Sequence, residues 1–312
     1  MKRPMITQVV RWVLAGTLFA QAGAAMPQPS EFSFAVINQA PNASDDAALR
    51  AAIAETDADN VAFVVASGIK SKAEPCSDQL YNSRKTLLDE AKNGLIVSLT
   101  ASDWAECKNA HGRSAAAERL NRLRDLFFVD EFSFGASKIT LVRQASMPKF
   151  RSYVENARWE VDNVLFATIN LPAANNHYRT DAGRNSEFED RLIANRDWLH
   201  RIFMFAAHRK IAGIVLFCDG NPLAAPSSPR LFDVSGKRNG FAEVHKQLNA
   251  LAPHFSGRVL VIHGASESES AAPGGISWGG NLGDLTLGSG WSKIRVNPTS
   301  PTLFTVAGDA RP

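Results

Sequence analysis

The chain has 312 residues, of which 45% are apolar and 21% are charged. This composition excludes a disordered chain, a collagen-like repeat and a coiled coil, and it supplies enough apolar side chains to bury a full core, so we expect one large domain. The formal net charge of +3 is carried entirely by Lys2, Arg3 and Arg11, and the absence of a basic stripe with interleaved aromatics argues against a nucleic-acid partner.

The first 25 residues have the pattern of a secretory signal peptide. The three basic residues precede or enter an apolar run from Trp12 to Ala20, and small residues suited to signal peptidase follow. The apolar run is shorter than the roughly 20 residues that a spanning helix needs, although a single membrane anchor is the alternative. We expect residues 1–25 to be removed, leaving 26–312 as a single periplasmic or secreted domain without a stable membrane anchor.

Export also changes the interpretation of the three cysteines. An oxidising compartment permits one disulfide and leaves one thiol. Cys76 and Cys107 both lie in loops after predicted strands, whereas Cys218 ends the apolar run GIVLFC and is expected to be buried. We predict a Cys76–Cys107 disulfide; the alternative is three reduced thiols.

Strands and helices alternate along the first half of the chain. Apolar runs rich in Val, Ile and Phe indicate strands, and apolar residues at helical spacing indicate helices. In chain order we expect a strand at 32–37, a helix at 44–56, a strand at 61–66, a helix at 80–93, a strand at 95–99 and a helix around 120–127.

The second half continues the alternation and ends in strands. We expect strands at 138–143 and 164–171, a long helix from about 186 to 210, a strand at 213–218, a helix at about 240–251, a strand at 258–263, a Gly/Ser-rich segment at 264–290, and strands at 292–297 and 302–306. Repeated β-α-β units predict an α/β domain with a large, mostly buried sheet.

Segments at the ends of these strands carry a resemblance to a known family. In chain order they read VINQAP (36–41), VASGIKSKAEPCSD, TASDWAEC (100–107), ENARW (155–159), NLPAANN (170–176) and VLVIHGASE (259–267). With these segments the chain resembles the calcineurin-like metallophosphoesterases, specifically a secreted bacterial branch, over nearly all of residues 26–312. The resemblance implies an α/β/β/α sandwich with a large mixed sheet core, and a site with two divalent metal ions.

The chain departs from this family where the metal ligands would stand. The family's Gly-Asp, Gly-Asn and Gly-His motifs are replaced by Asn38-Gln39, Ser67-Gly68, Thr100-Ala101-Ser102-Asp103 and Gly264-Ala265-Ser266-Glu267. Two cations held close together must be largely neutralised by anionic or imidazole ligands, which amides, glycine and serine do not supply. We therefore expect no two-metal centre and no metal cofactor.

Two functions from different classes remain. The first is an exported, non-catalytic protein that keeps the metallophosphoesterase fold and binds an unknown ligand or protein, with a binding or regulatory role. The second is an active metal-dependent phosphoesterase, a phosphoric ester hydrolase, with a rearranged site. The sequence assigns no catalytic residue.

Candidate binding residues follow from the replaced motifs and from polar groups at other strand ends. They are Asn38, Gln39, Ser67, Gly68, Ser102, Asp103, Asp219, His263 and Glu267. Neutral donors and acceptors, with Lys70 and Arg158 nearby, suit an anionic or a sugar-like group. Asp103, Glu106, Asp219, Glu267 and His263 could instead form a sparse site for one divalent cation.

One further motif, Gly275-Ile276-Ser277-Trp278-Gly279, matches the pattern of a serine-hydrolase nucleophile elbow. That elbow requires a strand before it, a helix after it and a later histidine. The last histidine of the chain is His263, which precedes the motif. We interpret the segment as a glycine-rich surface loop.

Overall fold

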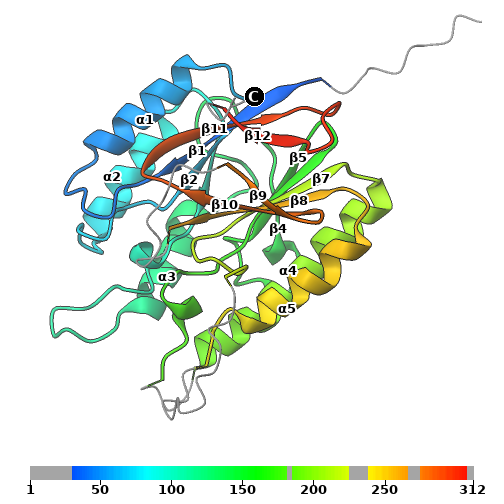
Figure 1. Cartoon of the computed structure of the whole chain (residues 1–312). Helices are drawn as coiled ribbons and strands as arrows, with labels where there is room; N and C mark the ends of the chain where they lie inside the picture. Colours follow the sequence, from blue (N-terminus) through cyan, green and yellow to red (C-terminus); the bar gives the residue numbers. More distant parts are fainter. Residues whose placement is uncertain (1–29, 181–184, 225–237, 266–274, 308–312) are drawn as a thin grey trace, which may run out of the picture.

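The computed structural model describes residues 30–180, 185–224, 238–265 and 275–307, and these form four layers (Figure 1). Helices from the first half of the chain cover a five-stranded sheet, helices from the second half cover a seven-stranded sheet, and the two sheets pack face to face. The predicted α/β/β/α sandwich with mixed sheets is confirmed. The predicted signal peptide at 1–25 lies outside the described residues.

In the five-stranded sheet, three adjacent strands run parallel to one another, and the other two join by antiparallel pairing. Its strands, in the spatial order β12-β11-β1-β2-β3, are β12 (Phe304–Val306), β11 (Gly290–Val296), β1 (Phe32–Asn38), β2 (Val64–Ser67) and β3 (Leu95–Ser98). β1, β2 and β3 are parallel to one another, and β11 is antiparallel to both β1 and β12. Parallel strands need crossover connections, which the intervening helices supply.

Three helices cover the outer face of this sheet: α1 (Ala47–Ala58), α2 (Asp78–Asp89) and α3 (Ala116–Phe127). Their buried Leu49, Leu88 and Leu123 share one apolar cluster with strand residues such as Val64 and Val97. α2 begins after Ser77, whose hydroxyl accepts a hydrogen bond from the Leu80 N–H at 3.2 Å and so caps the helix.

The seven-stranded sheet is parallel at its centre and antiparallel at both edges. In spatial order it consists of β4 (Val142–Arg143), β5 (Ala157–Val161), β6 (Val164–Thr168), β7 (Gly213–Phe217), β8 (Arg258–Gly264), β10 (Leu282–Leu287) and β9 (Ser277–Gly279). β6, β7, β8 and β10 run parallel, and β4, β5 and β9 pair antiparallel with their neighbours.

Helices α4 (Ser186–Arg209) and α5 (Ala242–Leu251) cover the outer face of the second sheet, on the opposite side of the molecule from α1 and α2 (Figure 1). Trp198 and Leu199 of α4 and Leu248 of α5 pack on the sheet. The connections contain short 3-10 turns: η1 (Ala101–Asp103), η2 (Gln144–Ser146), η3 (Pro148–Phe150), η4 (Asn175–His177) and η5 (Ala252–His254).

Aromatic side chains fill the space between the two sheets. Phe34 of β1 stacks on Phe63 with ring centroids 5.2 Å apart, and Phe63 in turn meets the Phe166 ring edge to face at 4.8 Å. Trp159 and Phe217 stack at 5.9 Å on the second sheet. Aromatic pairs add stabilisation beyond the apolar area that they bury, so this layer fixes the two sheets against each other.

The strand predictions were wrong in two regions of the chain. The Gly/Ser-rich segment at 264–290 contains β9 and β10, so Ser277-Trp278-Gly279 of the serine-hydrolase motif is an edge strand and not a surface loop. The predicted strand at 138–143 shortens to Val142–Arg143, and the ENARW segment instead opens β5. In each case sheet pairing, which a local pattern does not show, decides the structure.

Within the described ranges, no helix combines the length and the apolar character needed to cross a membrane.

Candidate functional site

The carboxyl ends of parallel strands from both sheets converge on a cavity of about 200 Å³, which we call the crevice. Its lining includes residues at or just after the ends of strands from both sheets: Asn38, Ser67, Thr100, Asp219, Gly264 and Leu287. Ligand sites of open α/β sheets occur at this edge, because the loops there can diverge without disturbing the sheet.

Five of the predicted binding residues line the crevice: Asn38, Gln39, Ser67, Ser102 and Asp219. The parallel pairing of β1 with β2 places Asn38 directly opposite Ser67. The structure therefore brings together residues that lie far apart in the sequence, while their role in binding remains a prediction.

Asn38 and Gln39 turn their amide nitrogens toward backbone carbonyls. Asn38 Nδ2 donates to Gly288 O at 3.1 Å, and Gln39 Nε2 donates to Gly68 O at 3.2 Å. Because a carbonyl oxygen only accepts, these two bonds fix which way each amide points. Among the described residues, no hydrogen bond reaches the side-chain oxygens Asn38 Oδ1 and Gln39 Oε1, so both can accept from another molecule.

The Ser67-Gly68 turn requires its glycine for conformational reasons. Gly68 has φ +88°, and a Cβ added there would lie 3.0 Å from Thr100 Oγ1. An acidic residue at this position would be strained by its backbone and crowded by Thr100. Ser67 is only 5% exposed and lines the crevice, and its hydroxyl has no hydrogen-bond partner within the described part of the chain.

Asp103, predicted to be a binding residue, is instead a fully buried structural carboxylate. Its Oδ1 accepts from the N–H groups of Ile69 (2.9 Å) and Lys70 (3.1 Å), and its Oδ2 accepts from Thr100 N (2.7 Å) and Thr100 Oγ1 (3.0 Å). Burial raises the pKa of Asp103, and these hydrogen bonds act in the opposite direction. The carboxylate joins the loops after β2 and β3.

Lys70 places an ammonium group beside these loops. The residue is 3% exposed, lines the crevice, and donates from Nζ to Ser71 O at 2.7 Å. Burial lowers the pKa of Lys70, whereas the negative charges of Asp103, Glu74 and Glu106 raise it. Burial is the larger effect, so the pKa of Lys70 lies below its ordinary value.

Asp219 and Glu106 are the carboxylates among the described residues that line the crevice, and Asp219 lies in the more buried environment. Asp219 Oδ2 accepts from Ala101 N at 2.6 Å and from Ala173 N at 2.7 Å, which ties together the loops after β3 and β6. Burial raises the pKa of Asp219 to about 6, although the two backbone hydrogen bonds lower it. No hydrogen bond to Oδ1 occurs among the described residues, so this oxygen is available to a ligand.

A left-handed turn, η4, holds the loop that carries Ala173. Its three residues have φ of 50°, 53° and 53° although none is glycine. The buried Arg191 side chain donates to the Asn176 side chain and to Asn176 O, and Asn176 Nδ2 donates to Gly240 O at 2.9 Å. Strain of this kind persists only where neighbouring groups fix the backbone, and here they fix the loop that binds Asp219.

His263 does not reach the crevice. It is fully buried on β8, with Nε2 2.7 Å from Asp284 Oδ1 and Nδ1 2.7 Å from Gly264 O. Glu267 lies outside the described residues. The alternative of a sparse one-metal site therefore loses His263 and Asp103, whose polar atoms are already engaged.

The crevice does not fit the two-metal centre that the resemblance implies. Among the described residues that line it, Asp219 accepts two backbone hydrogen bonds, Glu106 pairs with Lys72, and the end of β1 offers only neutral amide oxygens. The ammonium of Lys70 also lines the crevice. Among the residues that the structure describes, no three His, Cys, Asp or Glu side chains gather as a metal-holding group. A binuclear centre requires several anionic or imidazole ligands around both ions.

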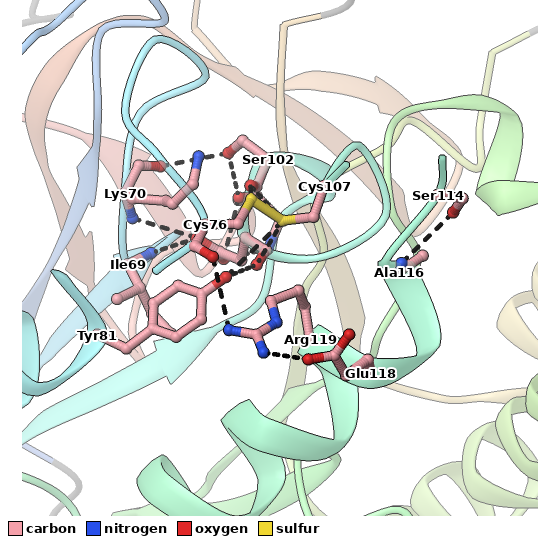
Figure 2. The surroundings of a disulfide bond; sticks show 12 residues. Ile69, Lys70, Cys76, Tyr81, Ser102, Cys107, Ser114, Ala116, Glu118 and Arg119 are labelled. Atoms are coloured by element: carbon pink, nitrogen blue, oxygen red, sulfur yellow. Dashed lines mark hydrogen bonds and ion pairs between the residues drawn. A yellow bond between two sulfur atoms is a disulfide. The ribbon is translucent and has the colours of Figure 1, made fainter. Parts of the chain in front are cut away.

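The predicted disulfide is present and lies next to these loops (Figure 2). Cys76 and Cys107 are bonded, with Cα atoms 5.9 Å apart, and Cys218 is a buried free thiol. Tyr81 lies beside the disulfide and donates from its hydroxyl to Asp103 O at 2.8 Å (Figure 2). The disulfide therefore links the β2–α2 and β3–α3 loops that shape one side of the crevice.

We expect thiol labelling of the unreduced, denatured protein to modify Cys218 alone. Closing a loop with a sequence separation of 31 residues stabilises a protein by about 3 to 4 kcal/mol in the chain-entropy model, so reduction should lower the free energy of unfolding by that order. Mass spectrometry after alkylation, beside a reduced sample, measures both states. Three labelled cysteines in protein from an oxidising compartment would contradict the pairing.

Sequence reasoning missed part of the site and misplaced one residue. The end of β10 and the β10–β11 connection supply Leu287, Gly288 and Ser289 to the crevice, whereas the sequence placed them in a Gly/Ser-rich segment and indicated no role for them. Arg158 was expected near the crevice, yet its guanidinium lies over the Phe205 ring of α4, 3.8 Å from the centroid. Alternation of apolar residues in 282–287 could have identified β10, and with it the loop.

Comparisons with known proteins add little to this geometry. No family model matches the chain, and no curated protein does. Among solved structures, the chain is similar to one described as GAP50, the anchor in the inner membrane complex of Plasmodium, with 14% identity and a TM-score of 0.47. The match covers 86% of this chain and 81% of that chain. At this distance we base no conclusion on it.

Proposed function

We propose that this chain is an exported binding protein with a metallophosphoesterase-like fold, whose crevice takes up a ligand without a two-metal centre and without catalysis. The family resemblance of the strand-end segments supports the fold-level part of this proposal. The position of the crevice at the carboxyl ends of strands supports binding there, and its polar groups could orient a ligand.

The observation that carries the proposal is the state of the remaining carboxylates. Asp103 accepts four hydrogen bonds from its own protein, and Asp219 binds two backbone N–H groups through one oxygen. A metal ligand must offer its lone pairs to the cation. Both oxygens of Asp103 hold loops together, and Asp219 keeps only Oδ1 without a hydrogen bond among the described residues. Binding through Asn38, Gln39 and Ser67 needs no such cation.

Export belongs to the same proposal. It rests on the signal-like pattern of residues 1–25, and the Cys76–Cys107 disulfide supports it because such bonds persist in oxidising compartments.

Asp219 supports the alternative, an active phosphoesterase with a rearranged site. A carboxylate with a pKa of about 6 at the edge of a cavity is suited to general acid-base catalysis. We keep this second candidate for that reason alone.

Hydrolysis assays separate the two candidates. We expect the purified protein to release no p-nitrophenol from chromogenic phosphate mono- and diesters above the level of an Asp219→Asn variant, because that substitution removes a crevice carboxylate whose pKa of about 6 suits a general base. Turnover that disappears in Asp219→Asn would establish the enzyme and overturn the proposal. Turnover that is equal in both proteins identifies a contaminant, because it does not depend on the crevice.

A further inference from the structure

We propose that the ligand of the crevice is a small, neutral, hydroxyl-rich molecule, such as a single sugar ring or a linear polyol. This inference rests on the proposed function, since it assumes that the crevice binds without metal ions. It follows from the atoms that the crevice leaves unpaired, from its charge and from its size.

The unpaired polar atoms of the crevice are mostly acceptors. Asn38 Oδ1 and Gln39 Oε1 remain after their amide nitrogens bind backbone carbonyls, and Asp219 Oδ1 remains after Oδ2 binds two N–H groups. Ser67 adds a hydroxyl that is almost fully buried, lines the crevice and has no partner in the described ranges. These atoms face the cavity and can bind water in the free protein, so a ligand gains affinity by pairing several of them at once.

A hydroxyl group matches this set because it donates one hydrogen bond and accepts others. Adjacent hydroxyls of a polyol can donate to Asn38, Gln39 and Asp219 and can accept from Ser67. Gly264 leaves room beside the carboxylate, since a Cβ added there would lie 3.2 Å from Asp219 O and in contact with Asp219 Oδ1 at 3.5 Å. An apolar ligand would leave all four groups unpaired.

The charges around the crevice disfavour an anionic ligand. Lys72 forms an ion pair with Glu106 at 3.5 Å, and Lys70 donates to Ser71 O in the field of Asp103 and Glu74. Lys72 is thus paired with a carboxylate, and Lys70 lies near three carboxylates of its own protein, although burial still lowers its pKa. Asp219, which has no lysine or arginine ion pair among the described residues, would repel a phosphate or carboxylate.

The size of the crevice sets an upper limit on the ligand. Its volume of about 200 Å³ is below the roughly 300 to 1,000 Å³ of sites for drug-sized molecules. The crevice thus suits one ring or a short chain, and a longer saccharide would have to extend into solvent.

Titration calorimetry and saturation-transfer NMR test this proposal on the mature protein. The probes are neutral monosaccharides (glucose, galactose, mannose, N-acetylglucosamine) and alditols (glycerol, mannitol), with inorganic phosphate and calcium chloride beside them. We expect at least one neutral probe to bind with a millimolar or tighter Kd, and phosphate and calcium not to bind.

Two substitutions locate the binding in the crevice. Gln39→Ala should weaken it about tenfold, the effect of losing one hydrogen-bonded partner of a bound ligand. Gln247→Ala is the matched control, because Gln247 also donates to a backbone carbonyl, Arg196 O at 2.8 Å, but lies on α5 away from the crevice. In Asp219→Asn, the side-chain oxygen can still accept from the Ala101 and Ala173 N–H groups, but the NH2 group then replaces the acceptor that faces the ligand. This substitution should weaken binding at least tenfold.

Failure of the polyol inference can be distinguished from failure of the proposed function. Binding of phosphate or calcium that depends on Asp219, absence of binding by every neutral probe, or equal losses in Gln39→Ala and Gln247→Ala would each overturn the polyol inference. None of these results would restore a phosphoesterase, which requires tightly held transition metal or crevice-dependent turnover. Those two readouts come from separate measurements.

Discussion

Replacing Asp103 by Asn should lower the free energy of unfolding by about 3 kcal/mol, because a buried charge-assisted network loses one of its acceptors. The carboxylate accepts from Ile69, Lys70 and Thr100 with both oxygens. An amide has one oxygen, so its NH2 group would face a backbone N–H that also donates. The added loss of negative charge beside the buried Lys70 ammonium acts in the same direction.

Urea unfolding followed by circular dichroism measures this effect. Asp197→Asn is the matched control, since Asp197 forms an exposed i,i+4 pair with Arg201 at 2.7 Å, and such pairs contribute about 0.3 to 0.5 kcal/mol. A loss of less than about 1 kcal/mol for Asp103→Asn, similar to that of the control, would show that Asp103 is not the junction of the two loops.

The second large effect concerns pH and Asp219. Its pKa is about 6 in the folded protein, against 3.8 for an ordinary aspartate. The folded state therefore binds this proton more tightly than the unfolded chain does. Protonation of Asp219 contributes to the free energy of unfolding at low pH, and this contribution is lost as the pH rises from about 4 to about 6. With partial solvent access, we expect this group to cost about 2 kcal/mol at neutral pH.

Asp219→Asn removes this titration while an oxygen can still serve the Ala101 and Ala173 N–H groups. As the pH rises from 4 to 7, the free energy of unfolding of the variant should therefore increase by about 2 kcal/mol relative to that of the unsubstituted protein. Paired denaturation curves across this range measure the difference, which cancels the contributions of other titrating groups. A difference that stays constant with pH would mean that Asp219 has an ordinary pKa.

The fold was largely predictable because its signals are local. α4 was expected at about 186–210 and spans Ser186–Arg209, since a long amphipathic pattern is the strongest sequence signal. β9 and β10 were missed because glycines dominate their segment, and only pairing with β8 makes β10 a strand. Order and register of strands depend on contacts between distant residues, which no local pattern contains.

The site was predictable in position but not in the state of its groups. Asn38, Gln39 and Asp219 lie at the ends of strands, so their convergence follows from a parallel sheet. Whether an acid binds a ligand or its own backbone depends on loop geometry. Asp103 and Asp219 look alike in the sequence, yet one is saturated inside the protein and the other faces the crevice.

Metal dependence of stability tests the central claim most directly. A protein that binds metal only when folded is stabilised by about 2.7 kcal/mol at a hundredfold excess over Kd, and for a domain of this size each kcal/mol raises Tm by about 2 to 4 °C. We expect manganese, zinc, iron(II) or a chelator to move the Tm of the mature protein by less than about 1 °C, with no stoichiometric metal by elemental analysis. Two equivalents of tightly held transition metal, together with a melt that a chelator lowers, would contradict the account.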